Sequence, residues 1–583
     1  MTVLEFIESK GWKYKLISGG KEATLETCPY CHDKHWRFNV NLETGAYICN
    51  RQNNCGAKGF FKLDGSKKVN APKVMQIKKE MFDTLTKTQI DYLASRGISK
   101  ETTVQGRVLN RKGALCFFYT NADGRPIGIK YRTIPKAGES KKIWSEQGSE
   151  MLLLNWDRVP KDSERLYITE GEIDMLSLLE IGIKNVVSVP NGTKSTEWIE
   201  KQYEWLERFK EIILCLDNDK AGQDAIKEIT TRLSDTKAEL KTVDLIFYKD
   251  PNEVLQDEGG RTKLKNIIEN NIKDLETQDV ILVSEIQAEN ETDAIDWQDQ
   301  TFNSLTGGLR YGEVLVFTGN SGCGKSTFVN NLMANLLNSG HKVYTHQGEF
   351  SPGAFKNNLY KIFCRPSQIE TYKNELKGKV YGRVSRETEK KIDEWLGDKL
   401  IINGSQVPSK KQLLKTMEKV YKRMGVKIFF IDNLMTVGIE GDDKYEEQKK
   451  LFLDLQEFAK KYNVFIGIVA HAKKNNQDFK ELDQYIIHGA SEIANLSNYI
   501  IFLHRLSKEE MEKLEETGIV ASTGAICLKD RKFGDVKDIG YWGYEIKTGR
   551  FLNVADNNRT LNKKYNWENY KEMAKFVEQE FPF

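Results

Sequence analysis

One stretch limits the possible folds of this chain more than any other, the glycine-rich run Gly319-Asn-Ser-Gly-Cys-Gly-Lys-Ser326. It fits the pattern G-x-x-x-x-G-K-[ST] and lies between an apolar run at 313–318 and a helical pattern at 327–337. In that strand–loop–helix setting, glycines let backbone N–H groups converge on phosphate oxygens at a helix N-terminus. The sequence therefore predicts a nucleotide-binding α/β domain, in which Lys325 reaches the β- and γ-phosphates and the Ser326 hydroxyl binds Mg²⁺. The predicted nucleotide-binding residues are Gly319, Asn320, Ser321, Gly322, Cys323, Gly324, Lys325, Ser326 and Thr327.

Several polar residues follow other apolar runs in the same part of the chain. Asp432 is placed to orient a Mg²⁺-bound water, Glu349 to polarise an attacking water, and His471 to sense the γ-phosphate. Because they lie at the ends of successive strands, they favour an NTPase. Lys529 and Arg531 occupy alternate positions of a basic strand end. We expect them to reach a neighbouring subunit as a cation and an arginine finger; an exposed basic strand end is the alternative.

Four carboxylates of the middle region also follow apolar runs, which alternate with helical patterns as in a parallel sheet. They are Glu170, Asp217, Asp219 and Asp250. Collected at one edge of a sheet, they would bind Mg²⁺ or Mn²⁺. Two such ions could activate a 3′-hydroxyl and neutralise a leaving phosphate. An isolated Asp-x-Asp pair also occurs in solvated loops, but the combined set indicates a metal site.

A basic segment lies just upstream of these carboxylates. It contains Lys130, Arg132 and Lys136, which are suited to contacts with a nucleic-acid template or a triphosphate. A solvated charged edge is the alternative.

Four of the nine cysteines crowd into the first 55 residues. They are Cys28, Cys31, Cys49 and Cys55. Two residues separate the first pair and five the second, which is close to a zinc ribbon with one wide knuckle. Four thiolates would hold one structural Zn²⁺ and supply folding energy that so short a segment lacks. His32 and His35 are possible substitute ligands. Trp36 and other aromatic or basic residues between the pairs suggest contact with single-stranded nucleic acid, or a small core.

The chain is long enough for several domains, with 583 residues and a formal net charge of 87 − 84 = +3. The remaining five cysteines are scattered, which favours a reducing compartment. We find neither a signal peptide nor a transit peptide, and no apolar run that could span a membrane, and therefore expect a cytoplasmic protein without a membrane partner. The expected divisions are a zinc-binding domain at 1–62, a carboxylate domain at 63–262, a linker at 263–292, a nucleotide-binding domain at 293–560 and a tail at 561–583.

This order of motifs resembles the bifunctional primase–helicases of short-tailed bacteriophages, of the gene 4 type, and the rear half is similar to the mitochondrial helicase Twinkle. The resemblance covers about Cys28 to Gly549 and is most specific in TEGEIDML, DNDKAG, KDPNE, TGGLRYGEVLVFTGNSGCGKST and KDRKFGD. It implies a multidomain α/β fold: an N-terminal zinc ribbon, a Toprim-containing RNA polymerase domain and a RecA-like helicase domain. It also implies that Lys130 and Lys136 match the family's basic motif.

The resemblance further implies a homo-hexamer, or a heptamer, that moves 5′→3′ on single-stranded DNA and unwinds forked duplex DNA. ATP or dTTP would be the fuel, and ribonucleotides the substrates for short primers. Arg505 and Tyr544 fall where the family sandwiches the nucleotide base, and 488–498 where a DNA-binding loop faces the channel. A phage protein would work in the host bacterial cytoplasm.

The C-terminal tail has aromatic and apolar residues at helical spacing after a plausible cap at Asn566, among them Trp567, Tyr570 and Val577. It lacks the strongly acidic run associated with polymerase docking in this family. We nevertheless expect it to engage a replicative DNA polymerase, with a helix packed on its own domain as the alternative.

Three other functions compete with a primase–helicase. The chain could be a helicase with an inactive primase domain, a Toprim topoisomerase or nuclease joined to an ATPase, or a non-enzymatic nucleic-acid scaffold. The cysteine quartet and the complete carboxylate set argue against the first. The order of the domains argues against the second, and the carboxylate set argues against the last.

Overall fold

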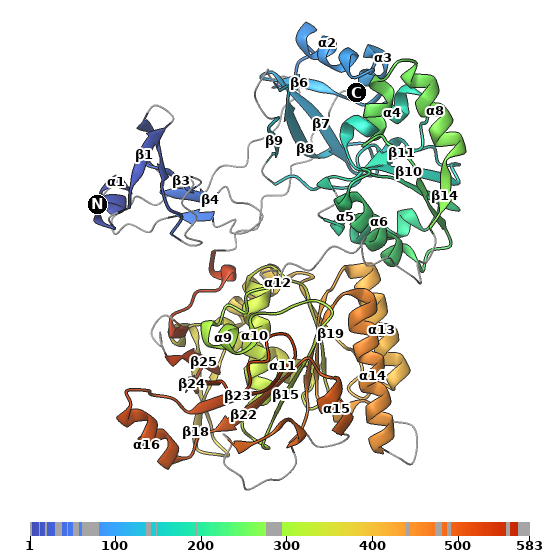
Figure 1. Ribbon diagram of the computed structural model, residues 1–583. Helices are drawn as coiled ribbons and strands as arrows, with labels where there is room; N and C mark the ends of the chain where they lie inside the picture. Colours follow the sequence, from blue (N-terminus) through green and yellow to red (C-terminus); the bar gives the residue numbers. More distant parts are fainter. Residues whose placement is uncertain are drawn as a thin grey trace. The chain divides into compact units, whose positions relative to one another are not determined.

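The computed structural model describes residues 3–569 apart from several gaps, and the chain divides into two compact units, residues 1–76 and 77–583 (Figure 1). The undescribed positions are 1–2, 11, 18–19, 30–35, 37, 44, 50–57, 61–80, 136–140, 147, 193–194, 276–293, 439–443, 473–480, 487–490, 555–559 and 570–583. The domain boundary that we predict between residues 62 and 63 falls in one of these gaps. No helix among the described residues is long and apolar enough to cross a membrane.

The first unit is a five-stranded antiparallel sheet in the order β1-β2-β3-β4-β5, preceded by one helix. Its small core includes the buried side chains of Phe38 and Val40. The elements are α1 (Val3–Ser9), β1 (Tyr14–Ile17), β2 (Glu22–Leu25), β3 (Phe38–Asn41), β4 (Ala46–Cys49) and β5 (Lys58–Phe60).

The second unit begins with a middle lobe, whose described residues lie between 81 and 275. Its front part is an antiparallel sheet, β6-β7-β8-β9, with two short helices. Every residue of β7 is buried, which explains its uninterrupted apolar sequence. The elements are α2 (Lys87–Ser95), α3 (Lys100–Gln105), β6 (Leu109–Arg111), β7 (Ala114–Thr120), β8 (Pro126–Thr133) and β9 (Ile143–Ser145).

The rest of the middle lobe is the predicted parallel sheet, in the order β11-β10-β12-β13-β14 with β14 antiparallel at one edge. Helices α4, α7 and α8 cover one face, and α5 and α6 cover the other. The elements are η3 (Trp156–Arg158), β10 (Arg165–Thr169), α4 (Glu172–Glu180), β11 (Val186–Ser188), α5 (Glu197–Leu206), β12 (Glu211–Cys215), α6 (Lys220–Leu233), β13 (Glu239–Val243), α7 (Pro251–Gln256), α8 (Gly260–Asn270) and β14 (Ile272–Asp274).

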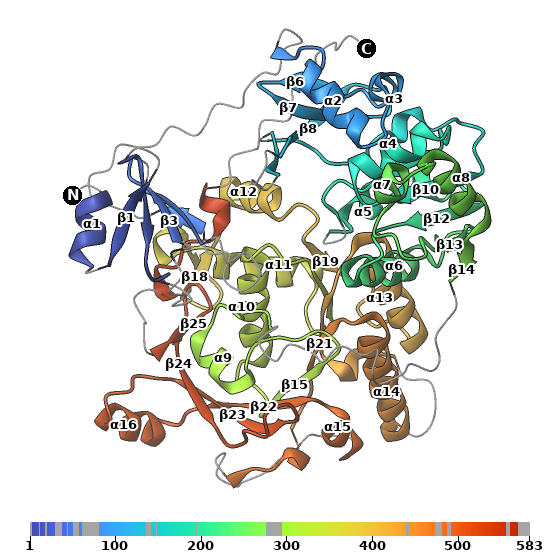
Figure 2. The same cartoon turned by 45° about the horizontal axis from the view of Figure 1, so that its top comes forward.

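The C-terminal lobe, with described residues between 294 and 569, is built on a nine-stranded sheet, β19-β16-β20-β21-β15-β22-β23-β24-β25. The strands from β19 to β22 are parallel, and the last three are antiparallel. Helices α9 to α12 pack on one face and α13 and α14 on the other (Figure 2). This architecture confirms the predicted α/β fold class.

The front half of this lobe contains the helices of the first face and the strands that lead to the predicted nucleotide site. Its elements are α9 (Gln300–Thr306), β15 (Val314–Gly319), α10 (Lys325–Asn338), β16 (Val343–Gln347), α11 (Pro352–Phe363), η6 (Pro366–Gln368), β17 (Glu370–Asn374), β18 (Lys379–Arg383), α12 (Arg386–Leu396), β19 (Leu400–Ile402) and α13 (Lys410–Met424).

The rear half completes the sheet. Its elements are β20 (Ile428–Asp432), η7 (Leu434–Thr436), α14 (Lys444–Tyr462), β21 (Phe465–Val469), η9 (Gln484–Ile486), α15 (Ser491–Leu496), β22 (Tyr499–Arg505), α16 (Lys508–Glu516), β23 (Thr523–Asp530), β24 (Ile539–Glu545), β25 (Arg550–Asn553) and η11 (Asn566–Asn569).

Two predicted segments differ from the structure. The linker expected at 263–292 is too long, because α8 and β14 belong to the middle lobe and bury Leu264, Ile267 and Ile268 in its core. In the tail, Asn566 starts a 3₁₀ turn rather than capping an α-helix. The turn is held to the C-terminal lobe, since the Trp567 ring is buried and its Nε1–H donates to Phe363 O at 3.0 Å. The expected apolar positions from Tyr570 onward, including Met573, Ala574 and Val577, lie outside the described residues.

Candidate active sites

A cavity of about 450 Å³ opens at the carboxyl ends of β10 and β12 in the middle lobe. Three predicted metal ligands line it, Glu170, Asp217 and Asp250. The strand ends bring them together, as expected from a parallel sheet. Asp219, two residues after Asp217, stands at the N-cap of α6.

Two of the carboxylates also shape the backbone around the cavity. Asp219 accepts a hydrogen bond from the Gly222 amide at 3.0 Å, and Asp250 accepts one from the Glu253 amide at 2.7 Å. Each therefore caps its helix with one oxygen and satisfies an otherwise unpaired N–H. The Asp-x-Asp and Lys-Asp-Pro sequences thus fix the helix starts as well as supplying charge.

The structure adds a fifth carboxylate, Asp174 in the first turn of α4, which we had not predicted as a ligand. Its side chain is buried, and the Asn252 amide donates to it at 3.3 Å. Burial and the nearby Asp250 and Asp217 raise the pKa of Asp174 to about 8. Its position two residues after Glu172 in the sequence Glu-Gly-Glu-Ile-Asp was the available signal.

This convergence of carboxylates fits a divalent cation. Burial raises the pKa of Asp217, and the neighbouring Asp250 and Asp219 raise it further, although Lys249 Nζ lies 3.1 Å from the Asp217 carboxylate. Mutual repulsion of this kind is relieved by a metal with hard oxygen ligands. The carboxylate ligand type fits Mg²⁺ or Mn²⁺, although in this structure no three of these described side chains lie close enough together to hold an ion without rearrangement.

Cations also line the cavity. Two of the three predicted basic residues are there, Lys130 and Arg132, and Lys136 lies outside the described residues. Lys130 is an anchor between sheets, because its ammonium pairs with the buried Glu172 and donates to Pro190 O at 2.6 Å. The remaining cations have no spacing that would have predicted them. They are Arg96, Lys141 and Lys249.

These cations are close enough to affect one another electrostatically. Burial lowers the pKa of Lys141, and the nearby Arg132, Arg96 and Lys249 lower it further. Such a group of positive charges beside carboxylates is suited to the phosphates of a nucleotide held on a metal.

The predicted phosphate loop connects β15 to α10 in the C-terminal lobe. Gly319 has φ +147°, and a Cβ at this position would lie 2.2 Å from Leu503 O, so the loop requires glycine there. Lys325 is in the first turn of α10, and its Nζ donates to Gly319 O at 2.9 Å and Asn320 O at 3.1 Å. The lysine therefore arches back over the loop at the helix N-terminus, where phosphate binds.

Three strand ends bring the other predicted residues of this site together. Asp432 ends β20, and burial raises the pKa of its carboxyl to about 6, against the opposing effect of the Ser326 hydroxyl. A buried carboxylate beside a serine hydroxyl fits Mg²⁺. His471 Nε2 lies 3.7 Å from the Glu349 carboxylate.

One residue that sequence reasoning missed joins these groups. The Asn433 amide donates to the Glu349 carboxylate, and its Nδ2 lies 3.3 Å from His471 Nε2. Asn433 Oδ1 accepts from the Met435 amide at 2.9 Å, which fixes the side chain. The signal was its place directly after Asp432 at the strand end.

Known families match both sites. Residues 167–255 match the Toprim-like family, and residues 295–552 match the DnaB-like helicase C terminal domain. The chain is 26% identical to the DNA helicase/primase of Enterobacteria phage T3 over 494 residues, which are 78% of this chain and 81% of the relative. It is 25% identical to the Twinkle homolog protein, chloroplastic/mitochondrial, of Arabidopsis thaliana over 550 residues, 85% of this chain and 74% of the relative.

The chain therefore combines a Toprim-like region with a DnaB-like helicase C terminal domain, the domain content of a DNA primase–helicase. Among solved structures, the primase fragment of the bacteriophage T7 primase-helicase protein aligns with 42% of this chain and 97% of its own length, at 22% identity and a TM-score of 0.27.

In this primase–helicase, the two residues predicted to reach a neighbouring subunit contact their own chain. Lys529 Nζ donates to Ala494 O at 2.6 Å and Asn495 O at 2.9 Å, and Arg531 also donates to Asn495 O. Burial, with a contribution from the neighbouring Arg531, lowers the pKa of Lys529 to about 8. Both cations therefore hold the end of α15, in the segment 488–498 that the resemblance assigns to DNA.

The residues predicted to sandwich the base come from two strands. Arg505 ends β22, and Tyr544 is in β24. Arg505 is close enough to lower the pKa of Tyr544, which burial and Glu545 raise. The Tyr544 ring packs on Phe551 with centroids 5.3 Å apart, and the Phe551 ring would be 3.5 Å from a Cβ at Gly324. Tyr544 is thus linked to the phosphate loop through one aromatic contact.

Two of the predicted zinc ligands can be placed in the first unit. Cys28 and Cys49 are both buried in its core, and Cys49 pairs with Phe38 between neighbouring strands. Cys31, Cys55, His32 and His35 lie outside the described residues. Among the residues that the structure describes, no three Asp, Glu, His or Cys side chains lie close enough together to hold a metal ion, either in the first unit or in the carboxylate cavity.

Proposed function

We propose that this primase–helicase assembles as a ring, moves 5′→3′ along single-stranded DNA with NTP hydrolysis, unwinds forked duplex DNA, and synthesises short RNA primers for the lagging strand. The observation that supports the proposal is the presence of two separate candidate sites in one chain. One is a cavity lined by Glu170, Asp174, Asp217 and Asp250 together with several cations, and the other has a phosphate loop, Asp432, Glu349 and His471 at neighbouring strand ends.

In the middle lobe, Glu170, Asp174, Asp217, Asp219 and Asp250 would hold Mg²⁺. When bound, the metal supplies positive charge for activating a 3′-hydroxyl and for the leaving phosphate. Cations of the same cavity would orient the triphosphate of the incoming ribonucleotide. They include Arg96, Arg132, Lys141 and Lys249.

In the C-terminal lobe, Lys325 would leave the loop carbonyls and bind the β- and γ-phosphates of ATP or dTTP. Ser326 and Asp432 would hold Mg²⁺, and Glu349 would orient and polarise the attacking water. Asn433 fixes the position of Glu349 relative to His471. A change at the γ-phosphate can therefore alter the positions of Glu349 and His471 together.

The remaining predicted residues are assigned to assembly and to partners. Lys529 and Arg531 are proposed to serve the nucleotide site of the next subunit in a hexamer or heptamer, and the segment 488–498 to contact single-stranded DNA. The cysteines Cys28, Cys31, Cys49 and Cys55 are proposed to hold one structural Zn²⁺, an assignment supported by the burial of two of them. We place the protein in the cytoplasm, with a replicative DNA polymerase as its partner.

The decisive experiment measures incorporation of labelled ribonucleotides on circular single-stranded DNA with Mg²⁺, in parallel with DNA-stimulated NTP hydrolysis. We expect Glu170→Gln to abolish primers and keep hydrolysis, and Lys325→Ala to abolish hydrolysis and unwinding but keep primers. Asp162→Asn, which removes an exposed carboxylate of the same lobe, is the matched control. If no template of mixed sequence yields primers while hydrolysis persists, the chain is a helicase with an inactive primase domain.

A further inference from the structure

The middle and C-terminal lobes of the second unit meet away from both active sites. Arg232, near the end of α6, is only 1% exposed. Its Nε donates to Lys422 O of α13 at 3.1 Å, and its Nη1 donates to Thr196 O and Thr196 Oγ1, both at 2.9 Å. One arginine thus joins the backbone of both lobes inside a buried contact. Burial of an arginine is tolerated only where acceptors of this kind surround it.

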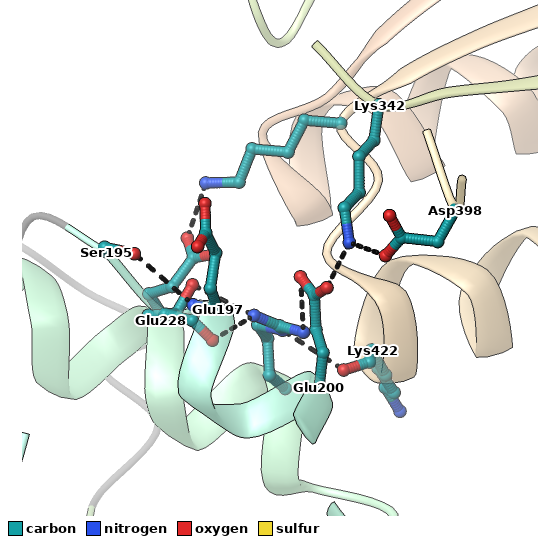
Figure 3. A network of polar contacts seen from close by, with 10 residues as sticks. Ser195, Glu197, Glu200, Glu228, Lys342, Asp398 and Lys422 are labelled. Carbon is teal, nitrogen blue, oxygen red and sulfur yellow. Dashed lines mark hydrogen bonds and ion pairs between the residues drawn. The ribbon is translucent and has the colours of Figure 1, made fainter. Parts of the chain in front are cut away.

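Four ion pairs cross between the lobes near Arg232. In each of them the C-terminal lobe contributes the cation and the middle lobe the carboxylate. Lys342 is also shared with Asp398 of its own lobe (Figure 3). The pairs are Lys342 with Glu200, Lys422 with Asp235 at 2.6 Å, Arg423 with Glu207 at 3.2 Å and Lys427 with Glu228 at 2.8 Å. This complementarity favours one docked orientation and disfavours like-charged alternatives.

A glycine adapts the surface of the C-terminal lobe to this contact. Gly425, at the C-cap of α13, has φ +65°. A Cβ added there would lie 2.3 Å from Glu200 Oε1 and 3.3 Å from both Nη atoms of Arg232. Because Gly425 has no side chain, the end of α13 fits between the side chains of Glu200 and Arg232.

The contact lies at the far ends of the elements that lead to the two sites. Helix α6 runs from the Asp219 cap to Arg232. Strand β16 starts after Lys342 and leads toward Glu349, and β20 starts after Lys427 and ends at Asp432. None of the contact residues lines the carboxylate cavity, so the contact is available for docking without cost to that site.

We propose that these residues form an electrostatic docking joint, which fixes the primase lobe on the helicase lobe of the same chain and which salt can release. Exposed ion pairs are individually weak and are screened by salt, so the joint depends on the buried Arg232 and on several pairs acting together. Holding the lobes at one angle would keep the primer-synthesis site at a fixed place relative to the strand that the helicase lobe handles.

A zero-length carbodiimide tests the joint directly, because it converts a carboxylate and an ammonium in contact into an amide and releases water to the reagent as its urea. The probe is applied to the full chain, followed by digestion and mass spectrometry. We expect amide bonds between Lys427 and Glu228 and between Lys422 and Asp235. Lys356 and Asp393, 2.8 Å apart within the C-terminal lobe, provide the control pair.

Two conditions and one mixture complete the test. In Arg232→Ala, or at about 1 M salt for the wild type, the inter-lobe products should fall by roughly tenfold relative to the product of the Lys356–Asp393 pair in the same sample. In an equal mixture of isotopically light and heavy chains, the inter-lobe peptides should be all light or all heavy. Absence of the inter-lobe products beside a normal control product, or products of mixed isotope content, would overturn the joint within one chain.

The test needs no catalysis, so its failure is distinguishable from failure of the proposed function. A functional arm then follows with Arg232→Ala. We expect that variant to keep DNA-stimulated NTP hydrolysis and primer synthesis on single-stranded circles, and to lose primer synthesis coupled to unwinding of a fork by several fold. Equal coupling in the variant and the wild type would show that the lobes need no such joint.

Discussion

At the scale of single residues, Asn433 shows how one amide can organise a catalytic site. Its Nδ2 faces both the Glu349 carboxylate and the His471 ring, while its Oδ1 accepts from the Met435 amide. The side chain therefore holds the general base and the sensing histidine of the proposed mechanism in one arrangement. A displaced base at a hydrolytic site is costly, because alignment supplies much of the rate.

Asn433→Asp separates these two roles. The substitution keeps the oxygen that caps the following turn but replaces the amide donor with a charge that repels Glu349. We expect the rate of DNA-stimulated NTP hydrolysis to fall by about 10²-fold, with nucleotide affinity and melting temperature close to wild type. Steady-state hydrolysis and nucleotide-binding titrations measure this. Unchanged hydrolysis would mean that Glu349 needs no amide partner.

A second residue, His346, makes the C-terminal lobe sensitive to acid. Its ring is buried in β16, Nε2 lies 3.1 Å from Thr436 Oγ1, and burial lowers its pKa to about 4. The folded pKa is below the unfolded value near 6.5, so the contribution of neutral His346 is complete above that value and is lost as the pH falls toward 4. At about pH 5 the loss in unfolding free energy is roughly 2 kcal/mol.

His346→Gln removes this titration. The variant should be less stable than wild type at neutral pH, because packing is lost, but its stability should change less between about pH 7 and pH 5. Denaturant unfolding of both proteins at the two pH values gives the comparison. An equal loss of stability in both proteins would assign the acid sensitivity to another group.

At the scale of elements, the 3₁₀ turn η11 is a structural part of the C-terminal lobe. Arg550, which is buried, donates from Nε to Ile362 O and from Nη1 to Leu561 O, at 2.9 Å and 2.7 Å. Tyr565 and Trp567 are buried beyond that point. A tail deletion that begins at residue 561 would therefore damage the fold as well as any partner contact.

The tail should be tested in two parts. Trp567→Ala is expected to cost about 3–5 kcal/mol of unfolding free energy, because a buried ring and one hydrogen bond are lost. Removal of 570–583 should leave the melting temperature and NTP hydrolysis unchanged and weaken coupling to a replicative polymerase. Calorimetry and leading-strand synthesis measure the two effects. Normal synthesis by the truncated chain would exclude the tail as the polymerase contact.

At the scale of the whole molecule, the chain combines a small unit with a much larger one. Residues 1–76 form their own compact unit, and its described core is built from a few side chains around Phe38, Cys28 and Cys49. A core of this size is marginal without a staple, and the proposed Zn²⁺ would supply one.

Removing that metal should affect one unit only. With a zinc-selective chelator, or in Cys49→Ser, amide hydrogen exchange should rise sharply over residues 3–49 and stay unchanged over 294–554. Primer initiation at specific sites should fall, and DNA-stimulated hydrolysis should persist. Full protection of 3–49 in metal-free protein would mean that the unit folds without a metal.

The parts of the site that could be predicted are those carried by local sequence. The phosphate loop, the strand-end carboxylates and the four cysteines can each be recognised by their spacing in the sequence. Backbone geometry and ligand chemistry restrict the residue types within a few positions of one another. Asp174, Lys249 and Asn433 were missed because a position close in the chain to a predicted residue does not by itself distinguish them from ordinary helix, loop and strand-end residues. Their role depends on which side chains surround them.

The sequence by itself therefore determined the order of domains, the fold class and the nucleotide and carboxylate motifs of this primase–helicase, since these depend on short-range periodicity and on residues close together in the chain. Only the tertiary structure decided that α8 and β14 extend the middle lobe, that Trp567 is buried, and that Arg232 meets Lys422 across 190 positions. Contacts of that kind arise from packing between distant segments, and no local pattern encodes which surfaces will meet.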